Sequence, residues 1–272
     1  MSTKRAVIIY SRQHVNENEL RRVVDIIESK GIQIITKIDS ESINKVPDNV
    51  DIAIVLGGDG TLLNVAKRIK VPCFGIRYGK VGALSEISPR EINEVIQLYT
   101  EHKYDVIEYT LLKCTVSETQ MIFHFFNDLV VISPERSLIY FDLVVDDEYL
   151  CSVRADGVII STTIGSTAYA LSAGGPIVDE EVNGIIIVAI CPQLGIVPPL
   201  VFSQSRKIKI KFRAVNKLLL VIDGSEKVEL PAPFTLVITK SSKTVRLIRF
   251  KRFFRLKRIL NLMLAGSGVH KV

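Results

Sequence analysis

The stretch Asp51-Ile52-Ala53-Ile54-Val55-Leu56-Gly57-Gly58-Asp59-Gly60-Thr61 decides how the N-terminal part of this chain folds. Its first six residues form a short apolar run with β-branched side chains, which predicts a buried strand. Three glycines around one carboxylate follow, and residues 62–68 have helical composition. A strand, a glycine-rich turn and a helix N-terminus form a cradle for an anion. Glycine lets the main chain approach a phosphate, and the free N–H groups and the helix dipole favour negative charge.

Asp59 does not suit a plain anion site, because its carboxylate would repel phosphate. The residue makes chemical sense if it holds a metal ion or takes a proton from a hydroxyl group that is being phosphorylated. The alternative is a tight strand–helix turn in which Asp59 only caps the helix. The pattern by itself leaves both interpretations open.

Size and composition indicate a globular protein with one large domain or two ordinary ones. The chain has 272 residues, of which 47% are hydrophobic and 24% charged. No apolar run reaches the roughly 18–20 residues that a membrane span needs. The N-terminus leads directly into a strand and has no signal-peptide pattern. We therefore expect a cytoplasmic protein with no membrane partner.

Cysteine and histidine usage argues against a zinc site or a disulfide framework. The four cysteines, Cys73, Cys114, Cys151 and Cys191, are widely spread and form no C-x-x-C pair. They are predicted to be buried small hydrophobic residues. The four histidines lie outside the glycine-rich segments, so we expect no histidine nucleophile and no metal site built from protein side chains alone.

The formal net charge of +6 suits polyanionic ligands such as nucleotides. The same charge is the one feature that suggests a nucleic-acid binder. The sequence offers no helix-turn-helix, zinc finger or RNP motif for that function. We therefore expect no nucleic-acid partner.

Residues 1–103 alternate strand and helix, which predicts a Rossmann-like α/β domain with a parallel sheet. Asn16 and Glu19 have the spacing of a capping box. Ser88-Pro89-Arg90-Glu91 has the pattern of a second helix start, with Ser88 as the capping residue. The predicted strands cover residues 6–10, 32–38, 51–56 and 71–76, and the predicted helices cover 16–30, the segment after Gly60, and 88–102.

Residues 104–248 contain many short strands in series, which predicts an all-β sandwich. Asp146-Asp147-Glu148 is typical of a hairpin turn between two of these strands, and 234–239 and 245–250 are predicted as the last two. Residues 249–272 carry basic side chains among Phe and Leu. Such a segment either lies on a membrane or packs back on the protein as a helix with a solvated basic face; we favour the second interpretation.

A second glycine-rich segment runs from Arg154 to Pro176: Arg-Ala-Asp-Gly-Val-Ile-Ile-Ser-Thr-Thr-Ile-Gly-Ser-Thr-Ala-Tyr-Ala-Leu-Ser-Ala-Gly-Gly-Pro. A predicted strand leads into a stretch dense in Gly, Ser and Thr. Its hydroxyls and main-chain N–H groups can bond ribose and amide groups, and the ring of Tyr169 can stack on a flat ligand. The composition favours a ligand-binding loop.

This segment resembles the D-G-x-x-x-S-T-P-T-G-S-T-A-Y-x-x-S-A-G-G-P signature of NAD kinases. Residues 57–61 match that family's GGDGT motif, and Asn127-Asp128 occupies the place of its Asn-Glu pair. Residues 72–82 resemble P-x-x-G-I-N-x-G-x-L-G, and Asp223-Gly224 matches a late Asp-Gly. The blocks occur in the family's order over most of the chain. GGDGT alone is shared with lipid kinases and, loosely, phosphofructokinases, whereas the GSTAY block is far more specific.

The resemblance implies an enzyme that transfers a phosphoryl group to the 2′-hydroxyl of the adenosine ribose of NAD, giving NADP. The donor would be ATP or polyphosphate, with Mg²⁺ offsetting the phosphate charge. The implied fold is an α/β domain followed by a β-sandwich, with the last segment returning to the first domain. Members of the family are commonly homodimers or homotetramers.

Site roles carried over from the resemblance fall into three groups. Asp59 would act next to the 2′-hydroxyl as general base or orienting group. Donor phosphates would be bound by Gly57, Gly58, Gly60, Thr61, Arg77 and Lys80. NAD would be bound by Asp59, Gly60, Asn127, Asp128, Arg154, Asp156, Thr167, Ala168, Tyr169, Ser172 and, on a looser alignment, Ala189. Of these, Asn127 and Asp128 would contact ribose or adenine. Asp156 would contact the nicotinamide end, either in its own subunit or in a neighbouring one.

Three departures from the family pattern bear on the chemistry. Arg77 replaces the usual Asn of G-I-N-x-G, Thr163-Ile164 replaces Pro-Thr, and Asp128 is one methylene shorter than Glu. The hydroxyl lost at Ile164 removes at most one polar contact, worth about 0.5–1.5 kcal/mol. Arg77 and Lys80 would add contacts to donor phosphates and widen donor use toward polyphosphate.

Two other functions compete with this one. A lipid or sugar kinase with the same GGDGT motif would not need the GSTAY block, which fits a dinucleotide pocket better. A non-catalytic nucleotide-binding regulator would be expected to lack the carboxylate of Asp59, which this chain retains.

Overall fold

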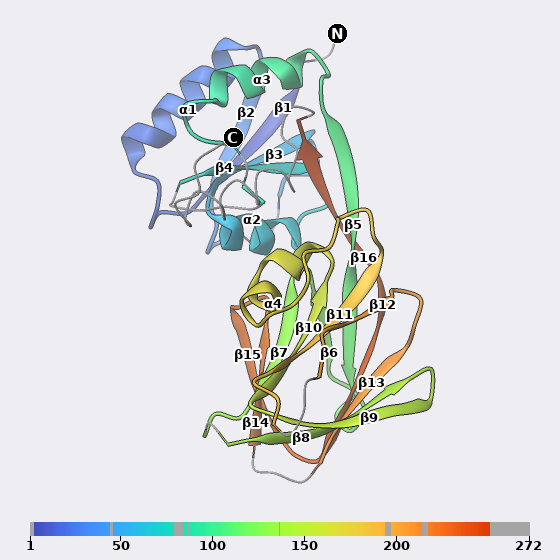
Figure 1. Cartoon of the computed structure of the whole chain (residues 1–272). Coiled ribbons are helices and arrows are strands. Elements are labelled where there is room, and N and C mark those ends of the chain that lie inside the picture. Colours follow the sequence, from blue (N-terminus) through green and yellow to red (C-terminus); the bar gives the residue numbers. More distant parts are fainter. Residues whose placement is uncertain are drawn as a thin grey trace, which may run out of the picture. The chain divides into compact units, whose positions relative to one another are not determined.

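The computed structural model describes residues 3–43, 46–78, 84–85, 87–135, 137–193, 197–213 and 217–250 (Figure 1). The chain divides into two compact units. The first runs up to Tyr109 and resumes at Thr244, and the second is Thr110–Lys243. Lys80 and the basic segment beyond residue 250, both singled out from the sequence, lie outside the described residues.

The first unit is an α/β domain with a parallel sheet, as predicted. Its strands lie in the order β2-β1-β3-β4-β16, and the paired strands run parallel. Helices α1 and α3 pack on one face of the sheet and α2 on the other (Figure 1). The bounds are β1 Arg5–Tyr10, α1 Glu17–Ser29, β2 Gln33–Asp39, β3 Ile52–Gly57, α2 Asp59–Ala66, β4 Cys73–Arg77 and α3 Ile92–Thr100.

The two predicted helix starts differ in outcome. At α1 the predicted capping box is present: the Asn16 side chain accepts the N–H of Glu19, and the Glu19 carboxylate accepts the N–H of Asn16. The predicted start of α3 at Ser88 is wrong. Glu91 donates its N–H to the Ser88 carbonyl over 3.0 Å, which closes a separate turn, and the helix begins at Ile92.

The second unit is an antiparallel β-sandwich, as predicted. One sheet has the order β12-β11-β10-β7-β14-β15, and the other is built from β16-β13-β8-β9 with β5 and β6. Side chains from both sheets share one core, for example Phe141 from β8 and Ile160 from β10. The bounds are β5 Asp105–Val116, β6 Ile122–Phe125, β7 Asp128–Ile132, β8 Ile139–Val145, β9 Glu148–Ala155, β10 Gly157–Thr162, η1 Ile164–Thr167, α4 Tyr169–Ser172, β11 Gly184–Ile190, β12 Leu200–Ser203, β13 Ile208–Phe212, β14 Lys217–Ile222, β15 Glu226–Pro231 and β16 Phe234–Arg249.

Strand β16 replaces the two strands predicted over residues 234–250. Its first residues pair with β13 in the second unit, and Leu247 pairs with Cys73 of β4 in the first. Residues 240–244, which were predicted to separate two strands, are themselves part of β16. The predicted turn at Asp146 and Asp147 joins β8 to β9, and both residues have positive φ (49° and 70°), as a type I′ hairpin turn requires.

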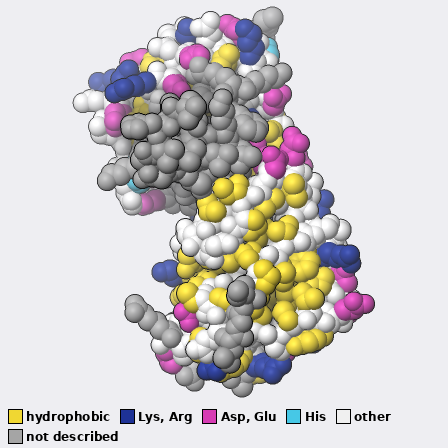
Figure 2. All heavy atoms as spheres, viewed as in Figure 1, with side chains coloured by type: hydrophobic (Ala, Val, Ile, Leu, Met, Phe, Trp, Pro, Cys, Tyr) yellow, Lys and Arg dark blue, Asp and Glu magenta, His cyan; other side chains and the backbone are white. Residues whose placement is uncertain are grey.

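The surface seen in Figure 2 has hydrophobic side chains gathered over the second unit, whereas Lys and Arg are spread around the visible face. Large side chains of this unit that are exposed include Tyr149, Leu150, Tyr169, Val182 and Val201. Within the described part of the chain, none of the helices is both long enough and apolar enough to cross a bilayer.

Candidate active site

In the first unit, Asp59 lies where a buried strand meets a helix. Strand β3 ends at Gly57, Gly58 caps α2 through its main chain alone, and Asp59 is the first helical residue. The interpretation of Asp59 as the helix cap is therefore wrong. Its carboxylate instead accepts main-chain N–H groups from Ser85 at 2.7 Å and Leu84 at 3.2 Å, which fixes the orientation of the carboxyl group.

Glycine is needed at one position of this turn for packing. A Cβ atom on Gly57 would lie 2.7 Å from the hydroxyl oxygen of Thr61, so any larger residue would push the first turn of α2 away. Gly58 and Gly60 differ, because a Cβ atom on either would meet nothing within 4 Å. The main chain at these two glycines therefore borders open space, which suits the approach of a phosphate.

Arg77 lies beside the glycine-rich turn. It ends β4 and is the register partner of Gly57 in the parallel pair β3–β4. Its Nη1 atom is buried, and no described residue provides that atom with a hydrogen-bond acceptor. A buried guanidinium nitrogen needs an acceptor, and a bound anion would supply one.

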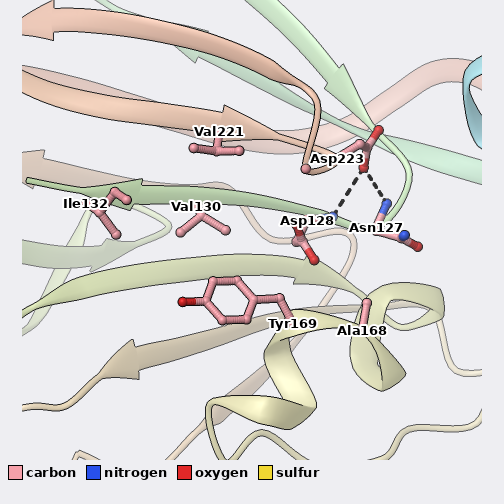
Figure 3. Close-up of a pocket in the computed structure, with 9 residues that line it drawn as sticks. Asn127, Asp128, Val130, Ile132, Ala168, Tyr169, Val221 and Asp223 are labelled. Atoms are coloured by element: carbon pink, nitrogen blue, oxygen red, sulfur yellow. Dashed lines mark hydrogen bonds between the residues drawn. The ribbon is translucent and has the colours of Figure 1, made fainter. Parts of the chain in front are cut away.

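In the second unit, a pocket of about 340 Å³ lies on the sheet face that carries α4 (Figure 3). Asp128 begins β7 and Asn127 precedes it, while Ala168 and Tyr169 come from the junction of η1 and α4. Of the predicted NAD contacts, these four line the pocket together. Residues 127 and 168 are 41 positions apart in sequence, so the fold joins the family's Asn-Glu position to its GSTAY block.

The floor of the pocket is apolar. Asp128, Val130 and Ile132 follow one another at every second position of β7 and therefore point to the same face. Val221 of β14, the register partner of Val130, extends this floor sideways. The ring of Tyr169 lies across from Val130 in Figure 3 and is 47% exposed. An apolar floor facing an accessible ring suits a flat aromatic ligand.

Asp128 supplies a carboxyl group to the pocket. Its side chain is buried, which raises the pKa of the carboxyl group to about 6; the neighbouring Asp223 carboxylate adds to the rise, and the main-chain N–H of Tyr169 opposes it. A buried carboxylate of this kind gains from any ligand group that donates a hydrogen bond to it.

The other predicted NAD contacts do not line this pocket. Thr167 is half-buried at the end of η1, and Ser172 is exposed at the end of α4. Arg154 lies on β9 with its guanidinium carbon 4.9 Å from the centre of the Tyr140 ring. Asp156 is exposed between β9 and β10, and Ala189 belongs to the core between the two sheets.

Five lining residues had no role assigned from the sequence: Val130, Ile132, Val221, Asp223 and Gly224. The three apolar ones are indistinguishable from core residues in a chain that is read alone. Val130 and Ile132 belong to β7, which is buried on both faces, and Val221 belongs to β14, which alternates buried residues with more accessible ones. Asp223-Gly224 carried a detectable signal, since the pair matched a family motif.

Family models match most of the chain. The ATP-NAD kinase N-terminal domain matches residues 3–104, and the ATP-NAD kinase C-terminal domain matches residues 127–250. The NAD kinase of Methanoregula boonei is 36% identical over 215 residues, which cover 78% of each chain. The chain belongs to the NAD kinase family. The NAD kinase of Carboxydothermus hydrogenoformans is 34% identical over 238 residues, covering 84% of this chain and 83% of that protein.

Solved structures agree with this membership of the NAD kinase family. An Archaeoglobus fulgidus NAD kinase in complex with ATP has a TM-score of 0.76 at 27% identity, covering 94% of this chain and 97% of that one. Yeast NADH kinase complexed with NADH has a TM-score of 0.81 at 22% identity, covering all of this chain and 90% of that one, and it supports the fold. The predicted family, fold and NAD kinase activity are confirmed.

Proposed function

We propose that this NAD kinase phosphorylates the 2′-hydroxyl of the adenosine ribose of NAD, with ATP and a divalent metal ion, and that the pocket of the second unit binds the adenosine. The observation that carries the proposal is the pocket itself. It combines an apolar floor, an accessible aromatic ring and a buried carboxylate. The adenine ring would stack between Tyr169 and the floor, and Asp128 would accept a hydrogen bond from an amino or hydroxyl group of the adenosine.

Asp59 is proposed to act on the hydroxyl that receives the phosphoryl group. A carboxylate that accepts a hydrogen bond from this hydroxyl orients its oxygen and withdraws its proton as the new bond to phosphorus forms. The two N–H groups of Leu84 and Ser85 hold the carboxylate in one orientation. This preorganisation supports a role in positioning as well as in proton transfer.

Donor phosphates are proposed to bind at the turn formed by Gly57, Gly58, Gly60 and Thr61, with Arg77 beside them. The exposed main chain at Gly58 and Gly60 and the buried Nη1 of Arg77 support this assignment. Lys80 is proposed as a further donor contact from the sequence pattern alone. ATP is the favoured donor, because the related Archaeoglobus fulgidus enzyme was solved with ATP.

A divalent metal such as Mg²⁺ is proposed to accompany the donor. Among the described residues, no three His, Cys, Asp or Glu side chains are grouped closely enough to hold a metal ion. Mg²⁺ commonly binds through one or two carboxylates together with substrate phosphates. The ion would offset the negative charge of the transferred group. If Asp59 is a metal ligand, as an alternative to its role as base, its carboxylate would hold the ion at the glycine-rich turn.

The remaining NAD contacts are proposals on family resemblance. Thr167 and Ser172 are the last residues of η1 and α4, which supply pocket residues, so they are proposed to contact the ribose and phosphates. Arg154, Asp156 and Ala189 are proposed for the nicotinamide half, with Asp156 acting within its own chain or from a second copy. A cytoplasmic location and a homodimeric or homotetrameric state are proposed on the same ground.

NADP formation tests the proposal directly. The purified chain is incubated with Mg²⁺ and NAD, with ATP or polyphosphate as donor, and NADP is measured by a coupled dehydrogenase. NAD with a 2′-deoxyadenosine in place of adenosine is the matched control, and we expect no phosphorylated product from it. Product formed from the deoxy analogue would place the phosphoryl group elsewhere and contradict the proposal.

Tyr169 variants test the adenosine pocket. Tyr169→Ala removes the ring and should raise the KM for NAD roughly 3- to 10-fold, as expected for the loss of one aromatic contact. Tyr169→Phe keeps the ring and should leave the KM within about twofold. Unchanged NAD kinetics in Tyr169→Ala would separate this pocket from NAD binding.

A further inference from the structure

The carboxylate of Asp223 gathers three consecutive main-chain N–H groups at the start of β7. Asn127 donates to Oδ1 over 2.7 Å and Asp128 over 3.3 Å (Figure 3). Phe126 donates to both oxygens over 3.1 Å. Bonds to a charged acceptor are about twice as strong as neutral ones. One side chain therefore holds the main chain of two residues that line the pocket.

Asp223 makes hydrogen bonds to β7 just beyond the last paired residues of β7 and β14. The last register pair between β7 and β14 is Leu129 with Ile222. Beyond it, Asp223 donates its own N–H to the carbonyl of Asp128 over 2.9 Å and receives the N–H of Asp128 on its side chain. The pairing of β14 with β7 ends where β14 turns toward β15. From there the Asp223 carboxylate accepts the main-chain N–H groups that a paired strand would otherwise bind.

The hairpin turn puts the Asp223 side chain in place. Asp223 and Gly224 have φ values of 47° and 70°, and Ser225 donates its N–H to the carbonyl of Ile222 over 3.1 Å. These features define a type I′ turn, in which Asp-Gly is a favoured pair. Since glycine also accepts this conformation, the carboxylate can be removed without straining the turn.

The opposite side of Asn127 is also bound. Its carbonyl accepts the main-chain N–H of Thr162 over 2.9 Å and the hydroxyl of Ser161 over 3.0 Å. Asn127 is therefore held on its carbonyl side by β10 and on its N–H side by Asp223. Without the carboxylate, the N–H of Asn127 would lose its bond to Asp223. The side chains of Asn127 and Asp128 would then be free to reorient.

We propose that Asp223 is a positioning residue for NAD: its carboxylate holds the main chain of Asn127 and Asp128 so that both side chains face the pocket before the substrate binds. The inference rests on the proposed role of this pocket in NAD binding. Holding contact residues in advance lowers the ordering cost of binding. The effect falls on substrate affinity, because Asp223 itself needs no contact with the reacting atoms.

A second consequence follows from charge. Two groups face the Asp128 carboxyl: the carboxylate of Asp223, which lies in the β14–β15 turn, and the main-chain N–H of Tyr169, which lies in α4. The Asp223 carboxylate raises the pKa of Asp128 through like-charge repulsion, in addition to the effect of burial. Removal of the Asp223 charge should therefore shift the protonation of Asp128 to lower pH. This shift reports the charge of Asp223, whereas the KM for NAD reports its positioning role.

The experiment compares Asp223→Asn and Asp223→Gly with Asp146→Gly in steady-state kinetics at several pH values. Asp146 is the matched control, since it is also the first residue of a positive-φ hairpin turn (φ 49°) and its carboxylate also accepts a main-chain N–H, that of Lys207. We expect Asp223→Gly to raise the KM for NAD roughly tenfold, the change that 1.4 kcal/mol produces. Asp223→Asn should raise it less, because its amide oxygen still accepts an N–H. Their kcat and their KM for ATP should stay within about twofold, and Asp146→Gly should match the wild type.

The pH dependence provides the second readout. In the wild type the KM for NAD should rise as the pH falls through about 6, because protonated Asp128 no longer offers a carboxylate to the ligand. In Asp223→Gly the midpoint of this rise should move to lower pH. A lowered melting temperature with kcat and the KM for ATP changed as much as the KM for NAD would make Asp223 a structural residue only and overturn the proposal.

Asn127→Ala and Asp128→Ala separate this inference from the proposed pocket. If neither variant raises the KM for NAD, the pocket does not bind NAD and the proposed site fails. If both raise it while folded Asp223→Asn and Asp223→Gly keep the wild-type KM, only the positioning role fails.

Discussion

Gly165 and Asn127 lie so close together that a Cβ atom on Gly165 would fall 2.2 Å from the carbonyl oxygen of Asn127. The same atom would lie 2.5 Å from the hydroxyl of Ser161. The turn η1 can therefore rest against the start of β7 only because residue 165 has no side chain. This contact sets how near the GSTAY segment comes to the residues that line the pocket.

Gly165→Ala should consequently weaken both the fold and NAD binding. The added methyl group must displace main chain on one side or the other, and overpacking of this kind costs about 1–3 kcal/mol. We expect a lower free energy of unfolding in urea and a higher KM for NAD. Gly184→Ala is the control, because its Cβ atom would come no closer than 3.2 Å to any neighbour and should cost less. A Gly165→Ala variant as stable as the wild type would contradict the packing argument.

Asp128 should make stability depend on pH between about 4 and 6. Because burial raises the pKa of Asp128 from 3.8 to about 6 in the folded state, the folded chain holds this proton over a range in which the unfolded chain has released it. The Asp128 contribution to stability therefore falls as the pH rises through this range, by at most about 1.4 kcal/mol per pH unit. Unfolding free energies of wild type and Asp128→Asn, measured from pH 4 to 7, should diverge accordingly.

Asp142 offers a control of opposite sign for this measurement. Its hydrogen bond from Arg213 holds the pKa of the Asp142 carboxyl below the ordinary value. That stabilisation is present at neutral pH and is lost as the pH falls through the lowered pKa. Asp142→Asn should therefore differ from the wild type most at neutral pH. Parallel pH profiles for wild type and Asp128→Asn would contradict the burial of an ionisable carboxyl in the pocket.

Asp59→Asn should lower kcat by at least 100-fold, the lower range for the loss of a general base. The amide keeps the shape of the side chain and one oxygen for the N–H of Ser85, so the melting temperature should change little. The Mg²⁺ dependence of the variant's kcat distinguishes a metal ligand from a general base, the two roles that the sequence left open. Partial recovery of kcat at high Mg²⁺ indicates a metal ligand, and no recovery indicates a base. Activity within tenfold of the wild type would remove Asp59 from the chemistry.

Arg77→Asn should reduce the use of polyphosphate more than the use of ATP. The family pattern has Asn at this position, and the buried Nη1 beside Gly57 favours an anion that a neutral amide would hold less well. The ratio of kcat/KM for the two donors is the quantity to measure, with Arg77→Lys as the charge-preserving control. An equal loss of kcat/KM for both donors would contradict the hypothesis that Arg77 widens donor use.

Local patterns in the sequence were sufficient wherever a structure depends on neighbours in the chain. The capping box of Asn16 and Glu19, the strand–turn–helix around Asp59 and the hairpin turn at Asp146 all form through contacts within a few residues. The same patterns failed at the start of α3, where Ser88 and Glu91 close a separate turn, and at β16, where one strand replaces two.

Periodicity and motif spacing are properties of the linear chain, so they were enough to predict an α/β part followed by a β part, the family, and the residues that carry its motifs. The residues that form the pocket could be identified only in the folded chain. Val130 and Val221 became its floor through strand register, and Asp223 reaches Asn127 across 96 positions of sequence. Such contacts depend on how strands pair and where they turn, and no local pattern of residues specifies that.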